Sequence, residues 1–242
     1  MVLATDHLTR FLSAAAKLLP DHADNGRAPR PFITISRQTG AGGYAIARAL
    51  LEKTRSCRPQ TIFGGWALFN ERLAEVVADN PSLKVSLRGL AEEEFASGIQ
   101  DMVSSWIAGL SPQSVVVSHL FKVIRSLAGG GKVIIVGRAG ACLTRPLMGG
   151  LHLRLVASLP TRVRRVMALR GVSEKDARQS ILARDRARAA LVKNYFHRDI
   201  EDPLLYDLVW NTETVGASAI AATTLRAVEA VVRQGPGKGL EL

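Results

Sequence analysis

A short apolar run, a glycine-rich loop and an amphipathic segment together constrain this chain more than any other stretch. Residues 33–35 (Ile-Thr-Ile) have the composition of a strand buried in a parallel sheet. Gly40, Gly42 and Gly43 then allow backbone angles that other residues resist, and from Tyr44 the apolar residues follow helical spacing. A glycine loop between a strand and a helix directs several N–H groups at one point, where the helix dipole favours an anion. The stretch predicts either a phosphate-binding loop or a tight turn without a ligand.

The loop differs from the usual P-loop pattern G-x-x-x-x-G-K-[ST] at three positions. When Gly42 is aligned with the second glycine, Arg37 stands at the first glycine, Gly43 at the lysine and Tyr44 at the Ser/Thr position. The backbone N–H groups of the loop remain suited to the phosphates of a donor nucleotide. The predicted nucleotide-binding residues are Ser36, Thr39, Gly40, Ala41, Gly42, Gly43 and Tyr44.

Strand and helix patterns alternate through the rest of the chain. Strands are predicted at 132–136, 151–157 and 206–210, with a further strand at either 61–63 or 66–69, and helices at 159–169, 173–193 and 215–232. This alternation favours a parallel sheet with helices on both faces. Ligands bind such sheets at the carboxyl ends of the strands. The glycine loop and the Gly137-Arg138 pair are therefore expected to meet at one rim.

The charge of the chain narrows the classes of partner. The 242 residues carry a formal net charge of +11, and residues 160–200 contain eleven Lys or Arg but four Asp or Glu. Such an excess favours anionic partners, nucleotides first among them. Nucleic acid is a less favoured partner, because only Tyr195 and Phe196 supply aromatic rings for stacking in this segment.

Signals for membrane insertion, export and metal binding are lacking in the sequence. No apolar run approaches the roughly 18–20 residues of a membrane span, and the first residues lack the order of a signal peptide. We therefore expect a cytoplasmic protein without a membrane partner. Cys57 and Cys142 are too few for a disulfide framework or a zinc site. His119, His152 and His197 stand singly, so no metal-binding residues are predicted.

Four segments carry further motifs in a fixed order. They are 33–43 with the glycine loop, 69–73 (Phe-Asn-Glu-Arg-Leu), 134–139 (Ile-Ile-Val-Gly-Arg-Ala), and 185–188 (Asp-Arg-Ala-Arg) continuing to 202–212. In this order the chain resembles the cytidylate kinase-like proteins of the P-loop nucleoside monophosphate kinase group, over residues 32–232. The resemblance implies an α/β protein with a P-loop three-layer α/β/α fold and a five-stranded parallel sheet.

The resemblance also divides the chain. Residues 32–242 would form the kinase-like domain, with an inserted helical lobe for the nucleoside monophosphate at 65–118 and a basic helical lid at 173–197. Residues 1–31 lie outside it. Apolar residues at helical spacing over 6–19 predict a helix there, followed by a linker at 20–31.

The activity implied by the resemblance is transfer of the ATP γ-phosphoryl group to CMP or a related nucleotide. Mg²⁺ would be bound through the phosphates of ATP, with no protein ligands assigned. Phosphoryl transfer depends on positioning and charge neutralisation, which arginine side chains supply. The residues assigned to catalysis are Arg37, Arg138, Arg184, Asp185 and Arg188.

Two of these arginines follow strands. Arg138 matches the arginine that binds the acceptor phosphate in the family, but Val136 and Ala139 replace two aspartates beside it. Arg37 stands at the loop entrance, where its guanidinium is a candidate for the charge of the missing lysine. Arg37 is also compatible with an ordinary surface role, and Arg138 with a salt bridge at the rim.

The other three residues belong to the lid. Asp185 and Arg188 match family positions, and Arg184 shares a helical face with Arg188 because the two are four residues apart. Ile181 replaces a further cation of some relatives. The lid helix is expected to start at Ser173, which forms a capping-box pattern with the carboxylate at 176.

Two other functions are compatible with the same residues. Because Gly43 replaces the P-loop lysine, the fold would also suit a non-catalytic sensor of a nucleotide or another anion. The basic lid would alternatively suit a nucleic-acid-associated protein, whose affinity should fall steeply with salt. The patterns give no indication of the oligomeric state.

Overall fold

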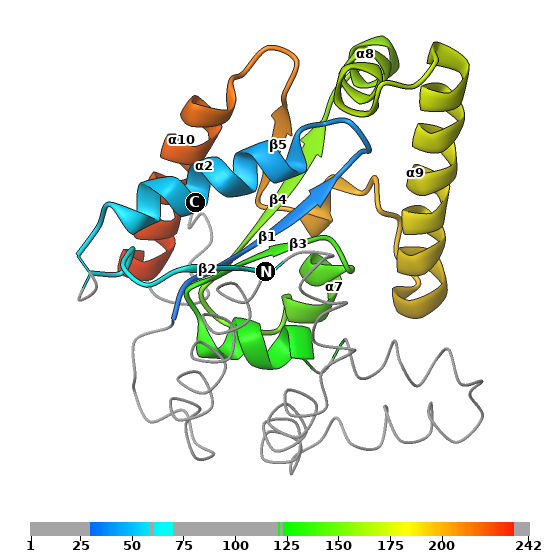
Figure 1. Ribbon diagram of the computed structural model, residues 1–242. Coiled ribbons are helices and arrows are strands. Elements are labelled where there is room, and N and C mark those ends of the chain that lie inside the picture. The colour runs from blue at the N-terminus through cyan, green and yellow to red at the C-terminus, as the bar shows by residue number, and fades with distance from the viewer. Residues whose placement is uncertain (1–29, 59–60, 70–120, 122, 235–242) are drawn as a thin grey trace, which may run out of the picture.

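The computed structural model describes residues 30–58, 61–69, 121 and 123–234. These residues form a five-stranded parallel sheet in the order β2-β3-β1-β4-β5, with β1 at its centre (Figure 1). The predicted P-loop three-layer α/β/α fold is confirmed. The strands are β1 (Phe32–Arg37), β2 (Ala67–Phe69), β3 (Val133–Val136), β4 (Gly150–Val156) and β5 (Leu208–Asn211).

Two strand predictions are resolved by the structure. Of the two positions considered for the second strand, the later one is occupied by β2, whereas residues 61–63 lie in a bend and turn. β5 starts at Leu208 and not at Tyr206. The reason is that the Tyr206 N–H donates to the Pro203 carbonyl at 3.0 Å and so closes the short 3-10 helix η1 (Pro203–Leu205).

Helices cover both faces of the sheet. On one face α2 (Gly43–Arg55) and α10 (Ala217–Gln234) pack against each other. A helix over residues 123–130 and α7 (Gly140–Thr144) cover the other face (Figure 1). Beyond the carboxyl ends of the strands stand α8 (Leu159–Arg170) and α9 (Glu174–Phe196).

Alternating side chains on β1 build a core on each face. Ile33 and Ile35 lie in the cluster under α2 and α10, whereas Phe32 lies in the cluster under the helix at 123–130. Burying each such side chain contributes about 1.5–3 kcal/mol. The same alternation on β4 places His152 and Arg154 on the face opposite α2, where both are almost fully buried.

α8 and α9 form a hairpin, in which only α9 corresponds to the segment 173–197 predicted as the lid. α8 ends at Gly171, which has a φ of +65°, and Ser173 then caps α9 by accepting a hydrogen bond from the Asp176 N–H at 3.2 Å. Ile181 is completely buried between the two helices. A cation at this position would be buried among apolar side chains, which explains why the lid carries an isoleucine there. The shared apolar core consists of Val163, Val166, Ala177 and Ile181.

Part of the sequence-based prediction falls outside the described residues. The helix at 6–19, the linker up to residue 29 and most of the lobe at 65–118 belong to this part. Among the described helices, none combines the length and the apolar character needed to cross a membrane.

Candidate phosphate-binding site

The carboxyl ends of β1 and β3 meet at one rim, as predicted. The strands pair in parallel with Ile35 opposite Val136, and the Gly137 N–H donates to the Ile35 carbonyl at 3.0 Å. A pocket opens at this rim, and three arginines from different elements line it. Gathering like charges in one cavity favours the binding of an anion. The three are Arg37 of β1, Arg138 after β3 and Arg188 of α9.

The glycine loop has the geometry of an anion cradle. Gly40 and Gly42 have φ values of +83° and +80°, and the Ala41 N–H donates back to the Gln38 carbonyl at 3.1 Å. Within the described part of the chain, no acceptor bonds the N–H groups of Gly40 and of residues 42–44. The first turn of α2 holds no acidic residue. These N–H groups and the positive end of the helix dipole are therefore suited to phosphate oxygens.

Two arginines of α8 donate hydrogen bonds to backbone carbonyls of the glycine loop. Arg162 donates to the Thr39 carbonyl at 3.3 Å, and Arg165 contacts the Gly40 carbonyl at 3.4 Å and the Thr212 carbonyl at 2.6 Å. Gly40 also permits the close approach of α8, because a Cβ there would lie 2.8 Å from the Arg162 carbonyl oxygen. Neither arginine was predicted from the sequence as part of the site.

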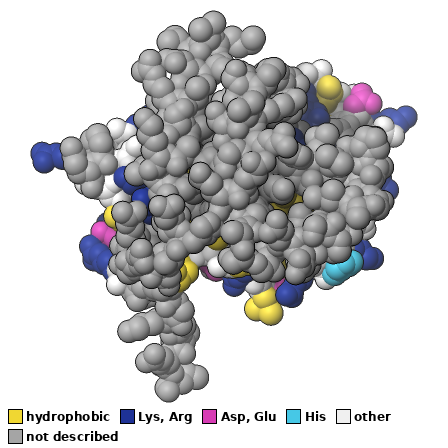
Figure 2. All heavy atoms as spheres, turned by 90° about the horizontal axis from the view of Figure 1, so that it is seen from below, with side chains coloured by type: hydrophobic (Ala, Val, Ile, Leu, Met, Phe, Trp, Pro, Cys, Tyr) yellow, Lys and Arg dark blue, Asp and Glu magenta, His cyan; other side chains and the backbone are white. Residues whose placement is uncertain are grey.

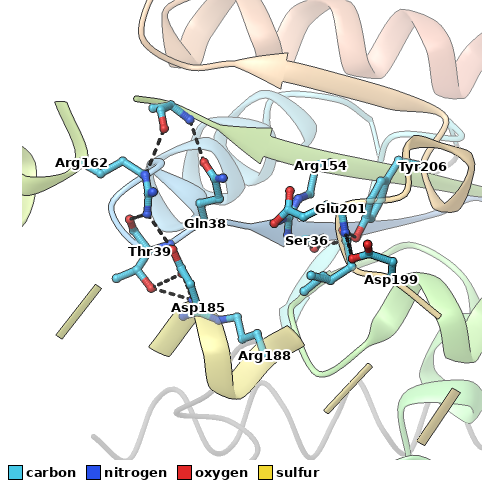
Figure 3. Close-up of polar contacts among 12 residues, drawn as sticks. Ser36, Gln38, Thr39, Arg154, Arg162, Asp185, Arg188, Asp199, Glu201 and Tyr206 are labelled. Carbon is cyan, nitrogen blue, oxygen red and sulfur yellow. Dashed lines mark hydrogen bonds and ion pairs between the residues drawn. The ribbon is translucent and has the colours of Figure 1, made fainter. Parts of the chain in front are cut away.

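Asp185 connects α9, the predicted lid helix, to the glycine loop. Its carboxylate accepts hydrogen bonds from the Thr39 N–H and hydroxyl and forms ion pairs with Arg162 at 2.7 Å and Arg188 at 3.0 Å. Figure 3 shows dashed lines from Asp185 to Thr39 and to Arg162, with Arg188 beside Asp185. Thr39, predicted to bind nucleotide, is thus engaged by the lid in this structure. The structure brings the predicted residues Thr39, Asp185 and Arg188 together.

Arg138 is presented to the pocket by a left-handed turn. Gly137, Arg138 and Ala139 have φ values of +82°, +56° and +55°, and the Gly140 N–H donates to the Gly137 carbonyl at 3.0 Å. For a residue with a side chain, this conformation costs about 1–2 kcal/mol. Within the described residues the Arg138 side chain makes no hydrogen bond or ion pair. Strain combined with an unengaged guanidinium is typical of a binding position.

Ser36 forms the floor of the pocket together with buried polar groups. Arg154 donates to the Ser36 hydroxyl oxygen at 2.9 Å, forms a short ion pair with Glu201 and lies over the Tyr206 ring (Figure 3). The Tyr206 hydroxyl donates to the Ile200 carbonyl at 2.8 Å, and burial raises the pKa of this hydroxyl. Ser36, predicted to bind nucleotide, thus lines the pocket, while Arg154 and Tyr206 were not identified from the sequence.

The remaining predicted residues occupy contrasting environments. Ala41 is fully buried and packs in the core under α2, and Gly43 is buried as well. The Tyr44 side chain is 61% exposed at the start of α2. Arg184 is exposed on α9 and, unlike Arg188, is not among the residues that line the pocket.

The described residues offer poor ligands for a magnesium ion of ATP. The P-loop Ser/Thr position is the exposed Tyr44, and the family aspartate positions are the apolar Val136 and Ala139. Across the described residues, no group of three or more His, Cys, Asp or Glu side chains is placed to hold a metal ion. Phosphate and water oxygens would therefore supply the ligands of a bound Mg²⁺.

Figure 2 shows described basic side chains at the margin of one face of the molecule. In the view of Figure 2, Lys and Arg side chains stand at separate places around the margin of the face. The arginines gathered at the strand ends are thus the more informative charge feature.

The fold and the pocket define the class of the protein as a P-loop α/β/α protein with arginines gathered at the loop. The sequence profile of the Cytidylate kinase-like family matches residues 32–214, and the chain belongs to this family.

Individual relatives are distant. The chain is 35% identical over 104 residues to a cytidylate kinase of Methanoculleus marisnigri, a match that covers 42% of this chain and spans about half (55%) of that protein. It is 27% identical over 203 residues to a cytidylate kinase of Methanothrix thermoacetophila, covering 82% of this chain and 99% of that protein. An uncharacterized protein from Eubacterium ventriosum has a crystal structure with a TM-score of 0.60 at 19% identity, covering 83% of this chain and 99% of that one. This last similarity concerns the fold alone.

Proposed function

We propose that this protein transfers the γ-phosphoryl group of ATP to a nucleoside monophosphate, with CMP as the first candidate acceptor. The observation that carries the proposal is the gathering of Arg37, Arg138 and Arg188 in one pocket beside the N-terminus of α2. Membership of the Cytidylate kinase-like family and the names of the relatives support the choice of substrates.

On the donor side, the loop would bind the phosphates of ATP through backbone groups. The N–H groups of Gly40 and of residues 42–44 have no acceptor among the described residues, and the Thr39 and Gly40 carbonyls accept hydrogen bonds from Arg162 and Arg165. Such donors need little reorganisation when an anion arrives. A loop fixed in this way would position the γ-phosphoryl group for transfer.

On the acceptor side, Arg138 would bind the phosphate of the monophosphate, and Arg188 would approach it from the lid. Arg138 sits on a strained turn that fixes its backbone, whereas Arg188 donates to the Thr39 hydroxyl at 2.6 Å and pairs with Asp185. Closure of the lid would thus bring a cation to the transferred group and keep the loop ordered. Neutralising the phosphate charges in this way lowers the barrier to transfer.

The substrates are tested by an assay of ADP release with ATP, Mg²⁺ and a panel of nucleoside monophosphates. The proposal predicts turnover with CMP above that with AMP, GMP and UMP. Turnover with another monophosphate but not with CMP would support kinase activity and show that CMP is not the acceptor. ATP-dependent thermal stabilisation without turnover would support the non-catalytic sensor instead.

The role of the loop is tested by a matched pair of glycine variants. Gly42 and Gly171 both have positive φ, and a Cβ at either would meet no atom within 4 Å, so alanine imposes similar strain at both. Only Gly42 lies in the cradle. Gly42→Ala should weaken ATP binding by about tenfold or more, because the added Cβ would keep a phosphate oxygen away from one N–H group, and a hydrogen bond to a charged group contributes roughly 1.5–3 kcal/mol. Gly171→Ala should leave it unchanged, and equal losses of affinity would contradict the cradle.

A further inference from the structure

The side chain of Arg37 crosses directly over Gly43. A Cβ built on Gly43 would lie 3.0 Å from Cγ and 3.4 Å from Cδ of Arg37. The first of these distances is tighter than nine in ten real contacts of a Cβ atom, so the Arg37 stem would have to move by a few tenths of an ångström. A side chain at position 43 and the present course of Arg37 are therefore in steric conflict.

The guanidinium end of Arg37 lies over a second glycine. A Cβ built on Gly137, where φ is +82°, would lie 2.0 Å from Nη1 and 2.9 Å from Cζ of Arg37. No side chain fits there while Arg37 keeps its position. Arg37 thus extends from the start of α2 to the end of β3 between two glycines. Its charge lies at the pocket lined by Arg138 and Arg188.

Positions 37 and 43 are the two at which the P-loop pattern requires a glycine and a lysine. In this chain Arg37 stands at the first glycine and Gly43 at the lysine, so the small and the cationic residue are exchanged. We infer that Arg37 supplies, from the first-glycine position, the phosphate-binding cation that a P-loop takes from its lysine. Gly43 is then a glycine because the stem of Arg37 crosses it. This inference rests on the proposed function, since it names the residue that holds the phosphates of ATP.

The exchange has a chemical consequence. A lysine ammonium is a point charge on a flexible stem, whereas a guanidinium is a planar group that binds phosphate through two parallel hydrogen bonds. Because the guanidinium of Arg37 lies against Gly137, it is displaced toward the acceptor side of the pocket. Arg37 would therefore contact the terminal phosphate of ATP in preference to the inner ones.

The test uses the full chain and two probes, inorganic tripolyphosphate and ATP with Mg²⁺, with affinities measured by isothermal titration calorimetry. The variants are Arg37→Gly, Gly43→Lys and the double variant Arg37→Gly/Gly43→Lys, which restores the usual P-loop pattern. Arg37→Gln keeps most of the stem but removes the charge, and it serves if the glycine variant fails to fold. Arg48→Gln removes an exposed cation of α2 that pairs with Glu52 and is the matched control.

We expect Arg37→Gly and Arg37→Gln to weaken tripolyphosphate binding by about tenfold or more, and Arg48→Gln by less than about twofold. The double variant should regain most of the lost affinity. Gly43→Lys alone should lower the melting temperature, because its side chain conflicts with Arg37. Wild-type affinity in Arg37→Gln, or a double variant as weak as Arg37→Gly, would overturn the inference while leaving the proposed function intact. A wild-type protein that binds neither probe would overturn both.

Discussion

The carboxylate of Asp185 on the lid accepts hydrogen bonds from both the backbone N–H and the hydroxyl of Thr39 in the loop, at 2.8 and 2.7 Å. The same carboxylate pairs with Arg162, which in turn donates to the Thr39 carbonyl. Loop, lid and α8 are thus connected through one side chain. Movement of the lid and the conformation of the loop should therefore be coupled.

The first prediction concerns this connection. Asp185→Asn removes the negative charge opposite two arginines and should lower the free energy of unfolding by about 2 kcal/mol, between the values for exposed and buried ion pairs. For a chain of this size that corresponds to a fall in melting temperature of about 4–8 °C. Urea unfolding measures the effect. Glu229→Gln, which breaks an exposed pair on α10, is the control, and similar losses in both variants would show that Asp185 is an ordinary surface carboxylate.

The second prediction separates acceptor from donor binding. Arg138→Ala should raise the KM for the monophosphate by about tenfold to a hundredfold, since hydrogen bonds between charged groups contribute roughly 1.5–3 kcal/mol. The KM for ATP should change little. Steady-state kinetics with each substrate varied in turn measures both constants. Arg186→Ala removes an exposed lid arginine as a control, and equal increases in the two constants for Arg138→Ala would show that its assigned role is wrong.

The third prediction tests the strained turn. Ala139 has φ +55° and ψ +28°, which glycine adopts more readily than alanine, so Ala139→Gly should stabilise the protein by about 1 kcal/mol. The same substitution at Ala187, exposed in the middle of α9, should destabilise it by about 1 kcal/mol. Thermal unfolding of both variants gives the comparison. A loss of stability in Ala139→Gly would indicate that the turn is not strained.

The fourth prediction concerns pH. Burial lowers the pKa of His152 from 6.5 to about 4, although the charge of Asp207 acts in the opposite direction. Because the pKa in the folded state lies below that of the unfolded chain, protons bind preferentially to the unfolded chain. The free energy of unfolding should therefore fall as the pH decreases from 6.5 to 4, by at most about 3 kcal/mol, and His152 should add no slope above pH 6.5.

Denaturant unfolding at a series of pH values measures this dependence. His152→Gln removes the titrating group and retains a polar partner for Thr34, whose hydroxyl lies 2.8 Å from Nδ1 of the imidazole. The variant should show a smaller slope between pH 6.5 and 4 than the wild type. If the free energy of unfolding depends on pH identically in the variant and the wild type, groups other than His152 cause the acid sensitivity.

Much of the fold was accessible from local sequence patterns. β3 is buried on both faces of the parallel sheet and is therefore a continuous apolar run, whereas β4 alternates apolar residues with His152 and Arg154; both positions were predicted to within one residue. The start of α9 was equally clear, because Ser173 and Asp176 form the expected cap. By contrast, β2 is a strand of only three residues, so two positions remained open until the structure was known.

The site was only partly accessible from the sequence. The loop and Arg138 follow strands and carry local signals, but Arg162, Arg165 and Arg154 contact residues about 50 to 120 positions away. In the sequence, Arg162 and Arg165 belong to the basic segment 160–200 and Arg154 to the apolar segment 151–157, so none of the three stands out from its neighbours. The spacing of Arg162 and Arg165 by three residues, which places both on one face of α8, is the signal that would have identified them.

The most direct test of the account is transfer of a radiolabelled γ-phosphate from ATP to CMP, measured for the wild type and for Arg37→Gln. The account predicts labelled CDP with the wild type, a large loss of label with Arg37→Gln, and no loss with Arg48→Gln. The absence of labelled product from CMP and from every other nucleoside monophosphate would contradict the assignment of this protein as a kinase.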